Sequence, residues 1–183
     1  MSERTPHLLS NCIGHMKKVM PWAVLSVIAL GMIAFFCIPS QTVLVVRTVK
    51  PDKNVLCARM IQGEEWMISY THSVNRRPVQ DFLRVEGSGL RILRSRFDAF
   101  GAGIPETSTA ENPLRFLPDG RLEYTVNRPV PEVRIFVGRV AGHVLHLKGR
   151  EIPFTSLAEP GAALRFFVEK RSLYQTFKGE CLW

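Results

Sequence analysis

The chain has 183 residues, a formal net charge of +8, 46% hydrophobic residues and four cysteines. This composition is typical of a globular protein with a packed core, and it excludes a low-complexity or disulfide-dense chain. The basic residues are scattered over many short segments rather than gathered on one helix. Nucleic-acid binding is therefore disfavoured, and contact with anionic lipid or an acidic partner is favoured.

The first segment with a clear signature is residues 21–39, which contain no Lys, Arg, Asp or Glu. As a helix they would extend about 28 Å, close to the thickness of a bilayer core. Lys17 and Lys18 precede them, so the positive-inside rule places residues 1–20 in the cytoplasm and the rest of the chain outside. We therefore expect a single-pass transmembrane signal anchor at residues 21–39.

A cleaved signal peptide is the alternative interpretation of this segment. Signal peptides have an apolar region of about 7–15 residues that ends in a small-x-small cleavage site. The apolar stretch here is longer, and its exit at residues 34–40 has no Ala-x-Ala sequence. Both features favour an anchor that is kept.

Residues 40–183 are expected to form one extracytoplasmic β domain. Apolar and polar residues alternate with a period of two and are interrupted by turn residues. This pattern predicts an all-β fold, a single antiparallel β-sandwich or partly closed barrel, preceded by the transmembrane helix. The final segment, residues 172–183, is either a short helix or a loose tail. The expected strands are residues 42–49, 55–62, 65–73, 79–86, 90–100, 122–127, 133–137, 143–147 and 164–169.

The cysteines divide between the expected compartments. Cys12 falls in the cytoplasmic segment and Cys37 in the span, which leaves Cys57 and Cys181 in the exported domain. That pair either forms a disulfide in an oxidising compartment or remains as one buried thiol and one tail thiol. No Cys-x-x-Cys or His-x-x-x-His pattern occurs, so the sequence predicts no metal site and no cofactor.

A polar row is predicted in the middle of the domain. A hairpin loop centred on Arg76-Arg77 pairs residue 74 with residue 79 and places His72 opposite Asp81. The next hairpin turns at residues 87–88 and places Asp81 opposite Arg94. Alternation puts His72, Asp81 and Arg94 on the apolar face of the sheet, in one row across three strands.

Two interpretations of this row remain open. In the first it is structural: Asp81 neutralises Arg94 and fixes the tautomer of His72. In the second it lines a pocket in which Arg94 or His72 meets an anion or a carbonyl group.

A glycine-containing loop follows the third of these strands, at Gly101-Ala102-Gly103-Ile104-Pro105-Glu106. Two glycines around one alanine favour a tight turn. The alternative is a loop that presents backbone N–H groups to an anion. It is not a phosphate-binding P-loop, because no Lys-Ser/Thr pair follows it.

Three runs carry a family resemblance: Thr71-His72-Ser73-Val74, Pro78-Val79-x-Asp81 and Phe100-Gly101-Ala102-Gly103-Ile104-Pro105. In this order and spacing they resemble the DUF1850 family of small exported bacterial proteins of undefined function. The family more often has Glu at the position of Asp81. The resemblance covers residues 42–169.

The resemblance also implies partners. Members of the family are typically encoded beside TRAP transporter components of the TAXI type, which import small organic acids. This implies an anchored accessory protein of the bacterial inner membrane, with a cytoplasmic N-terminus and a periplasmic domain, that contacts a multi-span TRAP transporter subunit or its solute receptor. The polar row and the loop at residues 101–106 would form its working surface, together with four hairpin residues. These are Ser73, Arg76, Arg77 and Pro78.

Two other functions are carried as alternatives. The first is a periplasmic module that binds a small organic anion, with Arg94 holding a carboxylate. The second is a periplasmic hydrolase with His72 as base and Asp81 as its orienting group. Ser73 adjoins His72 in the expected strand, so the two side chains would point to opposite faces. No Gly-x-Ser-x-Gly elbow occurs either, and the sequence therefore predicts no catalytic residue.

Overall fold

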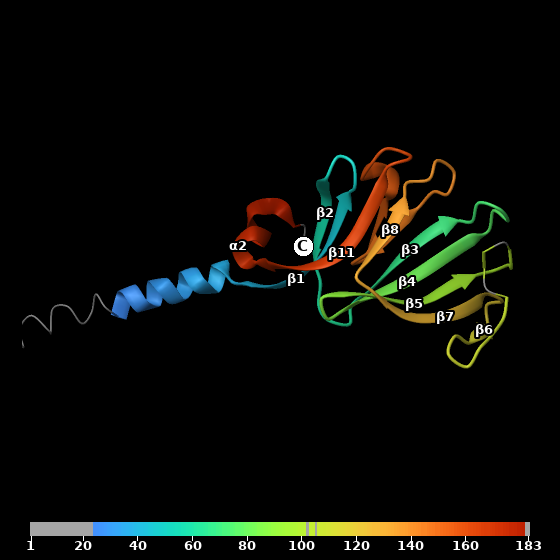
Figure 1. Cartoon of the computed structure of the whole chain (residues 1–183), viewed down its shortest axis with the longest axis horizontal. Coiled ribbons are helices and arrows are strands. Elements are labelled where there is room, and N and C mark those ends of the chain that lie inside the picture. Colours follow the sequence, from blue (N-terminus) through green and yellow to red (C-terminus); the bar gives the residue numbers. More distant parts are fainter. Residues whose placement is uncertain (1–23, 102, 105, 182–183) are drawn as a thin grey trace, which may run out of the picture.

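The computed structural model describes residues 24–101, 103–104 and 106–181. The expected cytoplasmic segment, residues 1–20, lies outside the described residues, as do the first three residues of the expected span. Residues 24–37 form a helix that leads directly into the first strand (Figure 1). Within the described ranges, no helix has the length and apolar character needed to cross a bilayer.

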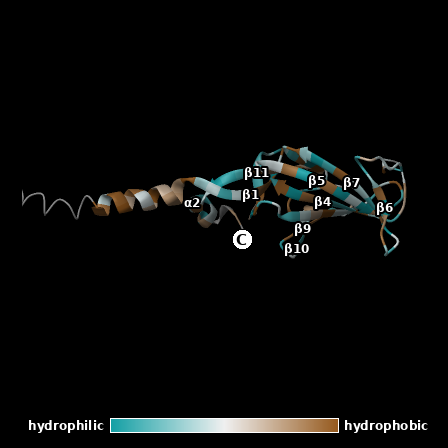
Figure 2. Cartoon of the chain, turned by 90° about the horizontal axis from the view of Figure 1, so that it is seen from below, coloured by the Kyte–Doolittle hydropathy of each residue, from teal (hydrophilic) through white to brown (hydrophobic). Residues whose placement is uncertain are grey.

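The helix at residues 24–37 is apolar and solvent-exposed. Its large hydrophobic side chains, from Val24 to Phe36, are 44–69% exposed. Figure 2 shows these hydrophobic residues along the helix, which projects away from the strands. The β domain therefore does not bury the surface of this helix.

The strands form two separate antiparallel sheets, which pack as a sandwich. One has four strands in the order β2-β1-β11-β8, and the other has seven in the order β10-β9-β3-β4-β5-β7-β6 (Figure 1). The bounds of the four-stranded sheet are β1 (Pro39–Thr48), β2 (Lys53–Arg59), β8 (Glu132–Phe136) and β11 (Ala163–Ser172). Those of the seven-stranded sheet are β3 (Glu65–Thr71), β4 (Pro78–Glu86), β5 (Gly89–Phe97), β6 (Leu114–Phe116), β7 (Leu122–Val130), β9 (Val144–Leu147) and β10 (Arg150–Pro153).

Every expected strand has a counterpart in these sheets, and two short strands were missed. β6 has three residues and β10 has four. Such segments are too short for a period of two to be recognisable in the sequence. The expected all-β, antiparallel architecture is confirmed.

The main core lies where the two sheets overlap. Phe166 of β11 stacks on Trp66 of β3, with ring centroids 5.6 Å apart. It also contacts Phe154, at the start of the short 3-10 helix η1 (Phe154–Ser156), at 5.4 Å. All three side chains are buried. This half of the sandwich is closed by aromatic packing.

The C-terminal segment covers the outer face of the four-stranded sheet. A single helical turn, α2 (Leu173–Gln175), leads into η2 (Thr176–Glu180) and then to Cys181. Cys181 is bonded to Cys57 of β2, with Cα atoms 4.4 Å apart. The structure thus resolves the two alternatives left open for these cysteines in favour of a disulfide. The bond also ties the last described residue to the sheet.

A second, smaller core lies at the far end of the seven-stranded sheet. It consists of Val79, Phe97 and Leu122, with Ile104 and Leu114 packed against them. Ile104 belongs to the loop between β5 and β6, so a loop covers the inner face here instead of the second sheet. The inner face of β3, β4 and β5 therefore passes from one core to another.

Candidate functional site

The expected pairing of His72 with Asp81 is wrong. In the β3–β4 hairpin Ile68 lies opposite Asp81, and β3 ends at Thr71. The backbone N–H of His72 donates to Arg77 O at 2.9 Å, so His72 is part of the turn. The loop is longer than the sequence suggested, and the register differs by four residues. Because four is an even number, the faces of both strands are still those predicted.

The expected pairing of Asp81 with Arg94 is also wrong, for a different reason. The register of β4 and β5 shifts between Phe82 and Leu83, where Leu93 is the extra residue of a β-bulge. Beyond the bulge Ser95 lies opposite Asp81, and Arg94 lies opposite Phe82. One extra residue moves every later side chain to the other face.

Arg94 is consequently on the outer face of the sheet. Its guanidinium lies 4.3 Å from the ring centroid of Phe82 and 3.0 Å from Glu65 Oε2. Its charge is satisfied there without Asp81. The three predicted residues therefore occupy a turn, the inner face and the outer face, and do not form one site.

The inner face carries a different polar cluster, made by Tyr70, Asp81 and Ser95. Ser95 Oγ donates to Asp81 Oδ1 at 2.5 Å. Burial raises the pKa of the Asp81 carboxyl, and hydrogen bonds from Ser95 and Tyr70 oppose this increase. Burial and the Asp81 charge raise the pKa of the Tyr70 hydroxyl. No cationic side chain forms an ion pair with Asp81 in the described part of the chain.

This cluster borders a cavity of about 260 Å³ between the two sheets. Strands β3, β4, β5 and β7 form one wall, and β8 forms the other. Most of the described residues that line it are aliphatic, and among them Asp81 is the only acidic and Arg128 the only basic residue. The lining residues are Ile68, Tyr70, Asp81, Leu83, Ile92, Ser95, Val126, Arg128, Val133 and Ile135.

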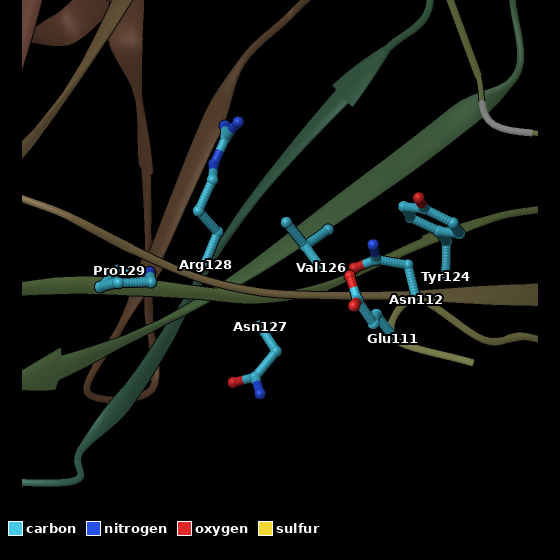
Figure 3. Close-up of a pocket in the computed structure, with 7 residues that line it drawn as sticks. All are labelled: Glu111, Asn112, Tyr124, Val126, Asn127, Arg128 and Pro129. Carbon is cyan, nitrogen blue, oxygen red and sulfur yellow. The ribbon is translucent and has the colours of Figure 1, made fainter. Parts of the chain in front are cut away.

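An open depression of about 520 Å³ adjoins this cavity, since Val126 and Arg128 line both. In Figure 3 Arg128 and Val126 project to one side of β7 and Asn127 to the other. Asn127 has a positive φ of 45°, at a second bulge where β5 and β7 change register. Glu111 borders the depression from the loop that precedes β6. The depression therefore lies directly beside the cavity.

His143 packs behind the polar cluster. Its ring lies between those of Tyr70 and Phe154, with both centroids 5.2 Å away. Burial lowers the pKa of His143. Its Nδ1 atom is buried and has no hydrogen-bond partner within the described residues. A neutral ring is favoured, and it fixes the position of Tyr70.

The loops at one end of the sandwich bring together two of the three runs that carry the family resemblance. We call residues 72–77, 98–101 and 138–142 the distal loops. Asn75 Nδ2 donates to Phe100 O at 3.3 Å, and the Arg77 guanidinium forms two hydrogen bonds with Asp98, at 3.0 and 2.6 Å. Ala141 O accepts from the backbone of Thr71 at 2.7 Å.

Gly101 leaves room for the Asn75 side chain in this packing. A Cβ atom at this position would lie 2.8 Å from Asn75 Nδ2. Gly103 has a φ of 83°, and Ile104 N donates to Gly101 O at 2.9 Å, which makes the expected turn. Glu106 is exposed, as are Ser73 and Pro78 of the hairpin. Ala102 and Pro105 lie outside the described residues.

A Ser–His–Glu arrangement, missed in the sequence, lies on the outer face of the seven-stranded sheet. Ser69 Oγ is 2.7 Å from His146 Nε2, and His146 Nδ1 is 3.5 Å from Glu151 Oε1. The residues come from β3, β9 and β10, so no sequence spacing predicts their contact. Ser69 sits in the middle of a strand paired on both sides. Backbone N–H groups there serve the sheet and do not form an oxyanion hole.

No group of three or more His, Cys, Asp or Glu residues is placed to hold a metal ion in the part of the chain that the structure describes. The polar groups that line the cavity are hydroxyl, carboxyl and guanidinium groups. These are binding groups for a polar or charged molecule.

The protein thus combines an antiparallel β-sandwich with an inter-sheet cavity and a bonded set of distal loops. Residues 67–154 match the model of DUF1850, a domain of unknown function, which supports the family assignment. The matched segment includes the polar cluster, the cavity and the distal loops. No curated protein and no solved structure matches the chain.

Proposed function

We propose that the protein is a membrane-anchored extracytoplasmic accessory protein that binds a partner protein through its distal loops. The family resemblance suggests that this partner is a subunit of a TAXI-type TRAP transporter or its solute receptor. One observation carries the proposal. Three loops that are remote in the sequence meet at one end of the sandwich: the two that carry motifs of the resemblance are bonded to each other, and the third is bonded to the last residue of β3.

The distal loops have the composition of a protein-binding surface. Val74 and Val140 are 66% and 79% exposed, and Phe100 is 41% exposed. Exposed apolar side chains that are held rigidly are typical of the centre of an interface. The bonds of Asn75 and Arg77 hold the loops in place, so little conformational entropy would be lost on binding.

The charged residues around these apolar side chains indicate the charge of the surface that the partner presents. Arg76 and Arg139 are exposed and have no ion-pair partner within the described residues. Arginine at the rim of an apolar patch favours an acidic surface on the partner. We therefore expect an apolar pocket bordered by Asp or Glu side chains.

Two features support the membrane anchor and the exported location. The helix at residues 24–37 exposes its hydrophobic side chains, and such a surface is stable only when lipid or another protein buries it. The disulfide between Cys57 and Cys181 fits an oxidising compartment. Both agree with an uncharged anchor at residues 21–39 that keeps the β domain outside the cytoplasm.

The test is purification of the intact chain from native membranes in mild detergent, followed by identification of the proteins that co-purify. We expect a stoichiometric multi-span protein or solute receptor with the wild type. Val140→Asp combined with Arg76→Glu should abolish its retention, because the change removes an apolar contact and reverses a charge.

Ile61→Asp is the matched control. Ile61 is also an exposed aliphatic residue, 69% exposed, but it precedes β3 and lies at the opposite end of this strand from the distal loops. It should leave the partner bound. The proposal is rejected if the distal-loop variant retains the partner at the wild-type ratio with an unchanged melting temperature, or if the wild type purifies alone.

A further inference from the structure

The inter-sheet cavity contains a carboxylate without a counter-charge. Asp81 accepts a hydrogen bond from Ser95 Oγ at 2.5 Å, and the Tyr70 hydroxyl lies close enough to lower its pKa. Both groups are neutral hydroxyls, and an ionised carboxylate has further acceptor sites. A mostly buried carboxylate that lacks a cation is costly. The arrangement leaves a place beside Asp81 for a donor that carries a positive charge.

A free cation lies on the same face of the sheet. Leu83 pairs with Ile92, and Ile92 pairs with Arg128, so Arg128 shares the inner face with both. The neighbouring row contains Asp81 and Ser95. Arg128 is therefore two strands and one row away from Asp81, and it has no hydrogen-bond or ion-pair partner within the described residues.

The rest of the cavity is apolar and small. Leu83 and Ile92 line it from the seven-stranded sheet, and Val133 and Ile135 line it from β8. A volume of about 260 Å³ is at the small end for a ligand pocket. It suits a molecule with a short aliphatic body. The depression lined by the residues in Figure 3 adjoins the cavity at Val126 and Arg128.

We propose that the inter-sheet cavity binds a small aliphatic amino-carboxylate, with its ammonium group at Asp81 and its carboxylate at Arg128. The ammonium group supplies the charge that Asp81 lacks, and the guanidinium of Arg128 holds the carboxylate. The aliphatic body contacts Leu83, Ile92 and the β8 side chains. A simple organic anion would pair with Arg128 alone, and it would be repelled by Asp81. Arg94, the residue expected to hold an anion, is on the other face.

The test measures binding of defined probes to the intact chain in detergent by isothermal titration calorimetry. L-leucine carries both charges, whereas 4-methylpentanoate lacks the amine and 3-methylbutylamine lacks the carboxylate. 5-Aminopentanoate carries both charges at a larger separation. We expect saturable binding of L-leucine or 5-aminopentanoate, and affinities about tenfold lower or weaker for both single-charge analogues.

Two variants test whether Asp81 and Arg128 bind the charged groups of the ligand. Asp81→Asn keeps the shape of the side chain and should weaken binding of the preferred probe about tenfold, and Arg128→Gln should do the same. Arg115→Gln, on the exposed strand β6, is the matched control and should bind normally. Thermal melting of each variant establishes that it is folded.

Each remaining outcome overturns the proposal. No saturable binding of either amino-carboxylate removes the site. Equal affinity for 3-methylbutylamine removes the role of Arg128, and equal affinity for 4-methylpentanoate removes that of Asp81. The distal-loop variant should bind the probes normally, so this proposal and the proposed docking function fail separately.

Discussion

The two halves of the inter-sheet space differ in what fills them. In the half where the sheets overlap, Phe166 packs between Trp66 and Phe154. In the other half the four-stranded sheet ends at β8, and the inner face turns polar at Asp81 and Ser95. The aromatic contacts that stabilise the sandwich are therefore concentrated away from the cavity. The cavity half can therefore carry a charge that the packed half would not tolerate.

The largest effect is expected in the packed half. Phe166→Ala removes a fully buried ring that touches two other aromatic rings. The free energy of unfolding should fall by about 3–5 kcal/mol. Urea denaturation measures this change, and Phe116→Ala, whose ring is exposed, should cost less than about 0.5 kcal/mol. Similar losses for both variants would mean that the main core is not where we place it.

The next largest effect is expected at the Cys57–Cys181 disulfide, which lies outside the inter-sheet space. Replacing Cys57 and Cys181 by Ser together should lower the free energy of unfolding by about 2–4 kcal/mol, because the unfolded chain gains the entropy of an open loop. Chemical denaturation with and without a reductant measures this. Cys37→Ser, at an exposed free cysteine, should behave as the wild type. An intact protein that is insensitive to reductant would contradict the prediction.

In the cavity half, Asp81→Asn should change how stability depends on pH. Burial raises the pKa of Asp81 in the folded state, so the contribution of this group is fully present below the pKa of the unfolded chain and is lost as pH rises through the folded pKa. The Asn side chain of the variant does not ionise, so the variant does not lose this stability as pH rises. Relative to wild type, its free energy of unfolding should rise with pH, by about 1.4 kcal/mol for each unit by which the pKa is raised.

Urea denaturation between about pH 2 and pH 8 covers the titration of both carboxyl groups, since the pKa of Asp81 is raised above the ordinary carboxyl value and that of Asp119 is lowered below it. Asp119→Asn provides a control of opposite sign, because Arg121 lowers the pKa of Asp119. The stability that Asp119 contributes is present above the pKa of the unfolded chain and is lost as pH falls through the folded pKa. If the two variants respond to pH in the same direction, the electrostatic description of the cavity is wrong.

The smallest effect should occur in the distal loops. Gly101→Ala places a methyl group against the amide of Asn75, which is the end of a flexible side chain. The cost should be about 1 kcal/mol, through the weakened bond to Phe100. A double-mutant cycle with Asn75→Ala measures the coupling. Strictly additive effects would show that Gly101 is not required for this contact.

Much of the fold could be predicted from the sequence, because alternation and turn residues mark the strands. The faces of β3 and β4 were predicted correctly even though their register was not. Arg76 has a positive φ of 54° in this turn. An arginine does not indicate such a conformation, so the sequence carries no sign of it. A loop whose length is misjudged by an even number of residues leaves the faces unchanged, so hydropathy cannot reveal the error.

The site was less predictable, because one extra residue in β5 decided which side chains lie on its inner face. Leu93 is apolar and follows Ile92, so the bulge resembles a continuation of a buried strand. It moved Arg94 out of the site and brought Ser95 to Asp81. Arg128 lies just beyond the predicted end of its strand, and it continues the inner-face alternation of Leu122 and Tyr124. Contacts between distant strands, such as that of Ser69 with His146, carry no local sequence signal.

The position of β11 has a consequence for when the protein can fold. β1 pairs along its length with β11, so the first strand to be synthesised waits for the last. While the ribosome is still making residues 163–172, β1 has only β2 as a partner, and one wall of the main core is incomplete. Contacts of such large sequence separation form late and slowly. The β domain therefore cannot complete its main core until its last strand has been made.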